Sequence, residues 1–334
     1  MNSLKRSLEY HDMRLAIIGS GSVSEFHIQA ALKAGFSISA IAASDYSKSA
    51  NYLHKKYDIP KYFVTTTELL NSNFYDCLLL SIQPEVTENL LSHIVDKEVP
   101  ILIEKPVVLD SKKLEDFESN NKICVGYNRR YYSTINELYA TQLVKPGFFH
   151  FSIVETTLDK KFNPFEIQQI LLKNTVHFFD LIHFLIPNFN LVDFAFSAHN
   201  LNSNWRIFQN QKFVGSLSLS FNSKKNSFIE FENYHENLVL KPLENLYKYD
   251  ILRKLPPRRN IPYKRYKPSN SNSLENSFIK ELGFFKPGFL GQHQDFFDFC
   301  TTKIRPMKLA SLKDAKNALQ TAEIVFRNIS EHLK

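Results

Sequence analysis

The sequence predicts an α/β protein built from a Rossmann domain over residues 1–130 and an α+β domain over residues 131–334 with a mostly antiparallel, open sheet. The 334 residues exceed the usual length of a single core. The first domain alternates short apolar runs with segments of helical spacing, which is typical of a parallel sheet with right-handed crossovers. The second domain carries alternating, β-branched and aromatic runs, which favour antiparallel strands.

The periodicity places the elements along the chain. In the first domain, strands are expected at residues 13–18, 38–43, 75–82, 99–103 and 123–127, with helices at 24–34, 47–57 and 85–97. In the second domain, strands are expected at 148–155, 192–198, 205–208, 212–221 and 227–232, with amphipathic helices at about 165–186 and 311–333. Residues 253–274 hold four prolines and many basic residues, which predicts a surface loop.

The composition is that of a globular protein, with 43% hydrophobic and 22% charged residues. No apolar run reaches the roughly 18 residues that span a bilayer, and the first residues lack the apolar core of a secretory signal. We therefore expect a cytoplasmic protein without a membrane partner. Three widely spaced cysteines outside any Cys-x-x-Cys pair predict reduced, buried thiols rather than disulfides or a zinc site: Cys77, Cys124 and Cys300.

The clearest chemical motif is the turn GSGSVS at residues 19–24, which follows an apolar strand and opens a helix. This context is typical of a dinucleotide-binding turn. Gly19 allows the tight turn, Gly21 lets the backbone approach a pyrophosphate, and Ser24 is small enough for close helix–strand packing. The helix N-terminus offers positive partial charge to phosphates. The alternative is an ordinary strand–turn–helix. The expected cofactor contacts are Gly19, Ser20, Gly21, Ser22 and Val23.

The second strand ends at Ser44-Asp45. A carboxylate at that point binds the adenosine ribose hydroxyls and repels a 2′-phosphate, which favours NAD over NADP. The register leaves open whether Ser44 or Asp45 faces the ribose, and with Ser44 the preference for NAD weakens. Asp45 could equally be a turn residue or helix cap.

The net charge of +7 fits anionic small molecules as well as nucleic acid. The loop from Arg253 to Lys267 interleaves basic and tyrosine residues, a pattern that suits a nucleic-acid backbone or the diphosphate of a nucleotide-sugar. A solvated loop is the simpler interpretation, and nucleic acid is not expected as a partner.

Three further segments follow the turn in order: IEKPVVLDS at 103–111, VGYNRRYYS at 125–133 and NTVHFFDLIHFL at 174–185. Together with SLKDAKNALQTAEIVFRNIS at 311–330, this ordered set resembles the Gfo/Idh/MocA family of glucose–fructose oxidoreductases and inositol dehydrogenases. The resemblance implies NAD or NADP as cofactor and hydride exchange with a carbinol carbon of a sugar, cyclitol or nucleotide-linked sugar. It also implies homo-oligomers formed through the sheet of the second domain.

The same resemblance assigns roles to single residues. The family's Glu-Lys-Pro motif falls on residues 104–106, so Glu104 and Lys105 are expected at the cofactor and Lys105 also at the substrate hydroxyl. Its His-x-x-Asp helix falls on His177 and Asp180. The loop that borders the nicotinamide falls on residues 81–84, which gives these expected cofactor contacts: Ser81, Ile82 and Gln83.

Alcohol oxidation removes a proton from oxygen as hydride leaves carbon, and two residues suit this chemistry. Lys105 lies at the C-terminal end of a parallel strand, where such sheets bind ligands. A cationic nicotinamide beside it would lower its pKa, so that it could hold or relay the proton. His177 suits a general acid/base. Without the resemblance, a surface ion pair of Lys105 and a packed helix histidine would be the simpler interpretations.

Three departures from the family pattern bear on catalysis. Lys173 stands four residues before His177, where an acidic partner is common, and α-helical spacing puts both on one face. A lysine there favours neutral histidine or an anionic substrate. Thr87 stands where a histidine is common, and the Gly-Gly pair before the His-x-x-Asp helix is missing. These departures motivate an alternative, a non-catalytic regulatory protein that binds the cofactor.

Further residues are expected to contact substrate. Residues 127–129 follow the fifth strand and could line a cleft, with an arginine meeting a carboxylate or phosphate, although interdomain ion pairs would explain them equally. A metal held by His177, Asp180 and His183 is not expected, because the spacing points His183 away. The expected substrate contacts are Tyr127, Asn128, Arg129, Lys173 and Asp180.

Overall fold

The computed structural model describes residues 13–156, 163–197, 201–221, 223, 225–250 and 286–333. The predicted basic loop at 253–274 lies outside these residues. The chain forms two compact units. Unit 1 comprises Met1–Val108, Ser119–Gly126 and Phe289–Leu312, and unit 2 comprises Leu109–Glu118, Tyr127–Gly288 and Lys313–Lys334.

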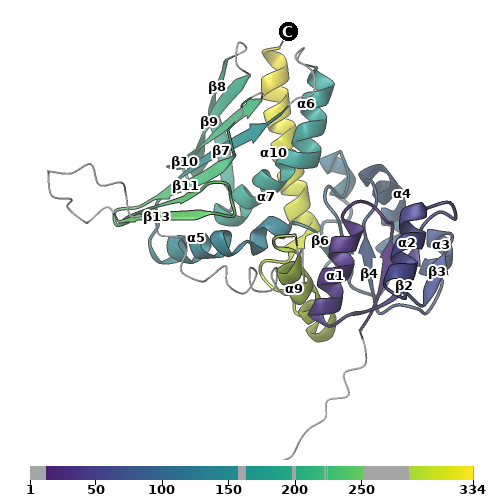
Figure 1. Ribbon diagram of the computed structural model, residues 1–334. Coiled ribbons are helices and arrows are strands. Elements are labelled where there is room, and N and C mark those ends of the chain that lie inside the picture. Colours follow the sequence, from purple (N-terminus) through teal and green to yellow (C-terminus); the bar gives the residue numbers. More distant parts are fainter. Residues whose placement is uncertain are drawn as a thin grey trace, which may run out of the picture. The chain divides into compact units, whose positions relative to one another are not determined.

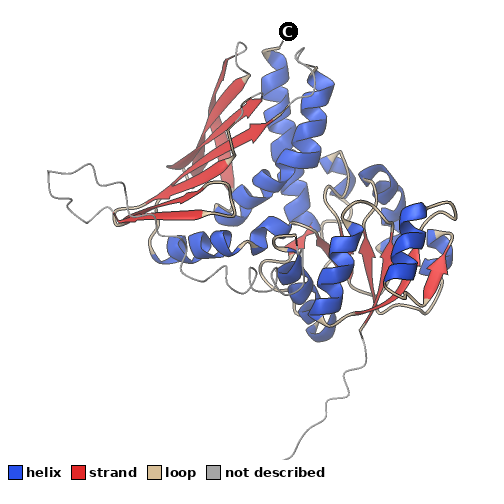
Figure 2. Ribbon diagram, viewed as in Figure 1, coloured by secondary structure: helices blue, strands red, loops and turns tan. Residues whose placement is uncertain are grey.

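The sheet of unit 1, whose strands are red in Figure 2, has the strand order β14-β6-β5-β4-β1-β2-β3. Its strands are β1 (Arg14–Ile18), β2 (Ser37–Ala42), β3 (Lys61–Phe63), β4 (Cys77–Leu80), β5 (Ile101–Ile103), β6 (Ile123–Val125) and β14 (Ala310–Ser311). All neighbours run parallel except β14, which is antiparallel to β6. The strand order reverses at β1, which lies between β2 and β4. Such a switch point is where open α/β sheets bind ligands.

The helices of unit 1 are α1 (Ser24–Ala34), α2 (Lys48–Lys56), α3 (Thr66–Leu70), α4 (Pro84–Ile94) and α9 (Phe289–Thr302). Their ends follow local chemistry. Ser47 Oγ accepts from Ala50 N at 3.2 Å and caps α2, and Thr65 caps α3 in the same way. Pro84 occupies the first turn of α4, and Gly35 ends α1 in the left-handed region.

Helix α9 was not predicted, and residues 289–312, which the sequence analysis places in the second domain, group with unit 1. The reason is aromatic packing. Phe36, just after α1, contacts the rings of Phe296 and Phe297 at centroid distances of 5.7 and 5.0 Å. Phe296, Phe299 and the buried thiol of Cys300 join the core of the parallel sheet. Figure 1 shows α1 and α9 side by side.

The sheet of unit 2 has the strand order β13-β12-β11-β7-β10-β9-β8. Its strands are β7 (Phe148–Glu155), β8 (Phe189–Ser197), β9 (Asn202–Gln209), β10 (Lys212–Phe221), β11 (Phe228–Glu232), β12 (Glu236–Leu240) and β13 (Leu246–Asp250). Only the β7–β10 pair is parallel, which confirms the predicted, mostly antiparallel sheet. Buried residues alternate with more exposed ones, so one face is covered and the other is open.

The helical segments of unit 2 are short 3₁₀ turns at Ser111–Leu114 and Asn128–Tyr131, α5 (Ser133–Val144), α6 (Pro164–Ile170), a π-helical turn at Leu171–Thr175, α7 (Val176–Leu185) and α10 (Leu312–Glu331). The helix expected at 165–186 is thus interrupted by the π turn. The last predicted helix corresponds to α10. In the part of the chain that the structure describes, no helix is long and apolar enough to cross a membrane.

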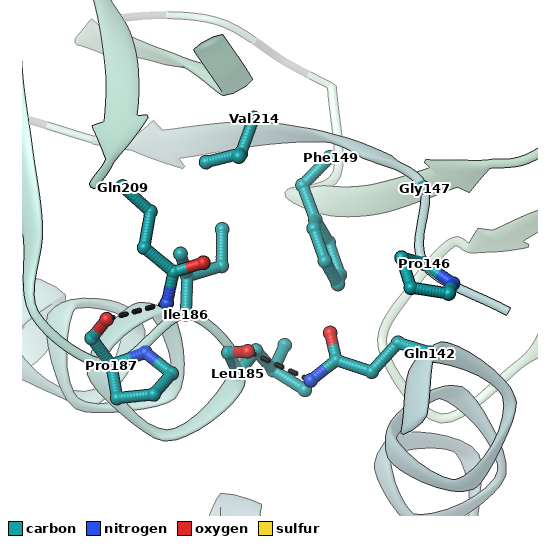
Figure 3. A pocket seen from close by; sticks show the side chains of 9 residues that line it. All are labelled: Gln142, Pro146, Gly147, Phe149, Leu185, Ile186, Pro187, Gln209 and Val214. Carbon is teal, nitrogen blue, oxygen red and sulfur yellow. Dashed lines mark hydrogen bonds between the residues drawn. The ribbon is translucent and has the colours of Figure 1, made fainter. Parts of the chain in front are cut away.

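Unit 2 contains a hollow of about 240 Å³ beside the end of α7 (Figure 3). Two glutamines border it. Gln142 Nε2 donates to the Leu185 carbonyl at 2.7 Å, and Gln209 Nε2 donates to the Pro187 carbonyl at 2.6 Å. Most of the remaining lining is apolar. It includes none of the residues that the sequence assigns to cofactor or substrate.

Candidate active site

The turn after β1 has the geometry of a phosphate-binding turn. Gly19 adopts φ of 97°, and its N–H donates to the Ala42 carbonyl at 2.8 Å. A Cβ on Gly19 would lie 2.3 Å from the Ser81 carbonyl oxygen, so only glycine fits. Gly21 is exposed, and a Cβ there would meet only that same oxygen, at 3.6 Å. The protein therefore leaves space over Gly21 that a pyrophosphate could use.

The N-terminus of α1 has no side-chain cap among the described residues, because its N-cap residue is Val23. Glu25 in the first turn is engaged elsewhere, since its Oε1 accepts from Lys56 Nζ at 2.7 Å and from the Tyr57 hydroxyl at 3.0 Å. Ser24 Oγ donates to Ser81 Oγ at 2.9 Å and is buried between α1 and β4. A helix start without a side-chain acceptor suits a bound anion. These residues therefore fit a dinucleotide phosphate.

The end of β2 brings Ser44 and Asp45 to the surface. The main-chain oxygen of Ser44 accepts from the Tyr62 hydroxyl at 2.8 Å, and Asp45 adds to the effect of burial in raising the pKa of Tyr62. The carboxylate of Asp45 therefore lies near β3. On the phosphate turn itself, Ser20 Oγ forms hydrogen bonds with Ser47 Oγ at 2.9 Å and with Ser49 Oγ at 2.8 Å. The phosphate turn is thus joined to the start of α2 by hydroxyl groups.

Residues 81–83 follow β4 beside the phosphate turn. Ser81 N donates to the Ile18 carbonyl at 2.9 Å, which continues the β1–β4 pairing. Ser81 is buried, Ile82 is partly buried and Gln83 is exposed just before α4. The Ile82 side chain would lie 2.5 Å from a Cβ at Gly19, so this loop and the phosphate turn form one surface.

Glu104 and Lys105 follow β5, the next strand of the sheet. Glu104 N donates to the Leu80 carbonyl at 2.9 Å, and Glu104 Oε2 accepts from Lys105 N at 3.2 Å. Glu104 Oε1 accepts from His27 Nε2 at 2.9 Å. A Cβ at Gly126 would lie 2.9 Å from Glu104 Oε1, so this glycine makes room for the carboxylate.

His27 and its partner His293 were not predicted as site residues. His27 occupies the buried stripe of α1 with Ser24, Ile28 and Ala31. A buried histidine needs a hydrogen-bond partner. A histidine among the small and apolar residues of this stripe was therefore the signal in the sequence that indicated a buried polar contact. The partner itself could not be found locally, because His293 is 266 residues away.

In unit 2 the segment after β6 packs against α7. The Tyr127 ring is buried and meets the His177 ring edge-on, with centroids 5.9 Å apart. Asn128 Nδ2 donates to the Pro287 carbonyl at 2.8 Å. The Arg129 guanidinium lies 4.5 Å from the centre of the Phe178 ring. Tyr127 and Arg129 therefore contact the first turn of α7, at His177 and Phe178.

Arg129 is unusual among these residues. Burial lowers the pKa of its guanidinium, with partial compensation from Tyr132, Glu155 and Glu244. Its Nη1 is buried and has no hydrogen-bond partner within the described residues. A buried, unsatisfied N–H costs about 1–3 kcal/mol, which a ligand acceptor would recover.

Asp180 forms a buried ion pair with Arg130. Arg130 Nε donates to Asp180 Oδ2 at 2.9 Å and Arg130 Nη2 to Asp180 Oδ1 at 2.5 Å. Asp314 lies 3.3 Å from the same guanidinium. Asp180 is completely buried, and burial raises its pKa to about 6. Both carboxylate oxygens are thus occupied by Arg130, which links the 3₁₀ turn at Asn128–Tyr131 to α7.

His177 follows the π-helical turn that contains Lys173. His177 is 9% exposed, and Lys173 is partly exposed. The expectation that these two share a face rests on 3.6 residues per turn, and this spacing does not hold across a π turn. Thr175 at the end of the turn donates to Glu155 Oε1 at 2.7 Å. π turns occur often at functional sites.

His183, the last residue of the triplet that was considered for a metal site, forms hydrogen bonds to α10. His183 Nε2 lies 2.9 Å from Thr321 Oγ1 and 3.1 Å from the Asn317 carbonyl oxygen, both on α10. Burial lowers the pKa of His183 to about 4. Among the described residues, no group of histidine, cysteine and carboxylate side chains is arranged to hold a metal ion.

The geometry of unit 1 defines a class of protein. A parallel sheet of Rossmann order, a left-handed glycine after β1 and a helix start without a side-chain cap together form a dinucleotide-binding fold. Residues 13–134 match the model of the family GFO_IDH_MocA, an oxidoreductase family with an NAD-binding Rossmann fold. This match over the first domain confirms the resemblance and the predicted nicotinamide cofactor.

Solved structures extend the likeness to nearly the whole chain. Levoglucosan dehydrogenase in complex with NADH is 12% identical, with 96% of this chain and 97% of that chain covered and a TM-score of 0.75. Myo-inositol dehydrogenase from Lactobacillus casei, in complex with NAD(H) and myo-inositol, is 17% identical, with 93% of both chains covered and a TM-score of 0.66.

UDP-N-acetylglucosamine 3-dehydrogenase from Acidithiobacillus ferrooxidans is 15% identical, with 97% of this chain and 99% of that chain covered and a TM-score of 0.69. At such identities these likenesses establish the fold. Among curated proteins, no significant match was found.

Proposed function

We propose that this protein is an NAD(P)-dependent dehydrogenase or reductase that exchanges hydride with a CH–OH carbon of a sugar-like substrate. One observation carries the proposal. The phosphate turn, the residue 81–83 loop and the Glu104-Lys105 strand end follow β1, β4 and β5, three neighbouring strands of the family's NAD-binding sheet. The carboxyl ends of parallel strands meet at one edge, where such sheets bind ligands.

The cofactor is assigned to unit 1. The amides of residues 19–23 and the start of α1 would hold the pyrophosphate. Ser44 and Asp45 are assigned to the adenosine ribose, and residues 81–83 to the nicotinamide side. When bound, the dinucleotide supplies the hydride acceptor or donor.

Two residues are assigned to proton handling. Lys105 would hydrogen-bond the reacting oxygen and stabilise negative charge on it as the proton leaves. His177 would exchange that proton, and its ring packs edge-on against the Tyr127 ring.

The substrate class follows from unit 2. Arg129 carries a buried N–H that could donate to a hydroxyl, carboxylate or phosphate oxygen, and with Lys173 it favours an anionic or nucleotide-linked sugar. Tyr127 and Asn128 complete the proposed substrate contacts. Asp180, which the sequence assigned to substrate, is better placed to hold Arg130, the neighbour of Arg129. The structural relatives named for levoglucosan, myo-inositol and UDP-N-acetylglucosamine are compatible with this class.

We also propose that the open face of the unit 2 sheet pairs with a second copy of the chain in the cytoplasm. Phe213, 48% exposed, contacts the Phe148 ring at 4.9 Å and the Phe208 ring at 5.6 Å. Such an aromatic cluster suits an interface. Light scattering should report an oligomer, and Phe213→Glu should shift it towards monomer. A monomeric wild-type protein would refute this part of the proposal.

The catalytic proposal is tested in two stages. Fluorescence titration with NADH and NADPH shows which dinucleotide binds, and a panel of sugars, cyclitols and nucleotide-sugars is then screened for NAD(P) reduction. Lys105→Ala should abolish turnover and largely keep cofactor binding, while Lys55→Ala, an exposed lysine on α2, should change neither. Normal turnover in Lys105→Ala would refute the assigned chemistry. Binding without turnover across the panel would favour the regulatory alternative.

A further inference from the structure

Unit 1 contains a hydrogen-bonded series of three buried polar side chains, two of which, His27 and His293, have no part in the proposed reaction. His293 Nε2 on α9 lies 2.9 Å from His27 Nδ1 on α1, and His27 Nε2 lies 2.9 Å from Glu104 Oε1 at the end of β5. Both histidines are completely buried, and the Glu104 side chain is 12% exposed. This series of hydrogen bonds therefore joins the helices α1 and α9 to the strand end that carries Lys105.

His293, the residue of this series that is farthest from Lys105, fixes the direction of the hydrogen bonds. His293 Nδ1 is buried and has no hydrogen-bond partner in the part of the chain that the structure describes. A proton on that nitrogen would be a buried, unsatisfied donor, at a cost of about 1–3 kcal/mol. His293 should therefore carry its proton on Nε2 and donate to His27 Nδ1.

The same reasoning applies to the His27 imidazole and the Glu104 carboxyl group. His27 Nδ1 is then an acceptor, so neutral His27 carries its proton on Nε2 and donates to Glu104 Oε1. Glu104 is left as an ionised acceptor. The reverse order, with Glu104 protonated, would place a proton on the partnerless His293 Nδ1. Burial, with a further contribution from His27, lowers the pKa of His293 well below its usual value and so supports the neutral state.

The carboxylate of Glu104 is held on two sides. Oε1 accepts from His27, and Oε2 accepts from the main-chain N–H of Lys105. Gly126 borders Oε1 so closely that no side chain fits between them. A rotation of the Glu104 carboxylate would therefore break the contact with the backbone from which the Lys105 side chain extends.

We propose that His27 and His293 are positioning residues, which hold the Glu104 carboxylate as an acceptor and thereby fix the strand end that bears Lys105. This inference rests on the proposed function for the role of Lys105, whereas the hydrogen-bond order does not. Packing alone does not require this series of hydrogen bonds, because apolar residues of similar size would fill the same space without desolvating three polar groups.

The hydrogen-bond order is tested on the protein without cofactor. In ¹⁵N-imidazole NMR spectra at pH 7, His27 and His293 should both carry a single ring proton, on Nε2. Assignments come from the loss of signals in His27→Gln and His293→Gln. A proton on His293 Nδ1, or a charged His293 at pH 7, would overturn the proposal whether or not the protein is an enzyme.

The positioning role is tested on the substrate found in the screen. His27→Leu should lower kcat by about 100-fold, the effect expected when a reacting group is misplaced by about 1 Å. The cofactor dissociation constant should stay near that of the wild type. His27→Gln, which can still donate to Glu104, should recover part of kcat.

Phe36→Leu is the matched control, since Phe36 contacts the ring of His293 with a centroid distance of 6.4 Å and packs against α9 without a polar role. It should lower the melting temperature and leave kcat unchanged. Wild-type kcat in His27→Leu, or an equal loss in Phe36→Leu, would refute positioning. A wild-type protein that binds no dinucleotide would instead refute the proposed function and leave the NMR result standing.

Discussion

A single methyl group added at Gly19 or at Gly21 should separate stability from cofactor binding. At Gly19 the added Cβ would lie 2.3 Å from the Ser81 carbonyl oxygen and 2.5 Å from the Ile82 side chain, on a backbone with φ of 97°. The backbone conformation alone costs about 1–3 kcal/mol, and the overpacking between β1 and β4 a further 1–3 kcal/mol. Gly19→Ala should therefore lose about 2–6 kcal/mol of unfolding free energy.

Gly21→Ala is the matched variant. Its Cβ would be 3.6 Å from the Ser81 carbonyl oxygen, an ordinary contact, so the unfolding free energy should remain near that of the wild type. The methyl group would occupy the proposed pyrophosphate space and weaken NADH binding by about tenfold or more, about 1.4 kcal/mol. Urea unfolding and NADH fluorescence titration measure the two effects. A stable Gly19→Ala, or a Gly21→Ala that binds NADH normally, would refute the reasoning.

Two further predictions concern buried ionisable groups in unit 2. Asp180→Ala removes both hydrogen bonds that this carboxylate accepts from the buried Arg130 guanidinium, and it should cost about 3–5 kcal/mol in urea unfolding; a loss below 1 kcal/mol would contradict the buried pair. For His183, burial lowers the pKa to about 4, so below pH 6.5 the unfolded chain binds a proton that the folded protein does not. The unfolding free energy should therefore fall as the pH drops from about 6.5 to 4, by up to about 3 kcal/mol from this group. His183→Gln should flatten this slope, and an unchanged slope would exclude His183 as its source.

Local patterns predicted most of the regular structure. All ten strands expected from periodicity are present, two of them (148–155 and 212–221) with the expected ends and the others with shifted ends, because apolar alternation and turn residues act over a few neighbours. The short β3 and α3 were missed, since three and five residues carry too little pattern. The strands β12, β13 and β14 and the helices α5 and α9 were also missed. α9 is stabilised by Phe36, a residue more than 250 positions earlier in the chain, and not by a signal of its own.

In the candidate site, too, features that depend on neighbouring residues could be predicted, and features that depend on distant residues could not. The phosphate turn could be predicted because it depends on a left-handed glycine, a preceding strand and a following helix, all within residues 14–34. The role of Asp180 could not, because Arg130 lies 50 residues earlier and a helix pattern says nothing about which charge faces it. The π turn before His177 was also beyond the reach of a spacing argument based on α-helical geometry.

By itself, the sequence determined the Rossmann sheet, its phosphate turn and the resemblance to the Gfo/Idh/MocA family, because backbone conformation and hydrophobic period are properties of adjacent residues. Only the tertiary structure decided the partners of the buried polar groups: His27 with Glu104 and His293, and Arg130 with Asp180. The physical reason is that a buried polar atom must find an acceptor or donor wherever packing brings one, and packing joins segments regardless of their distance along the chain.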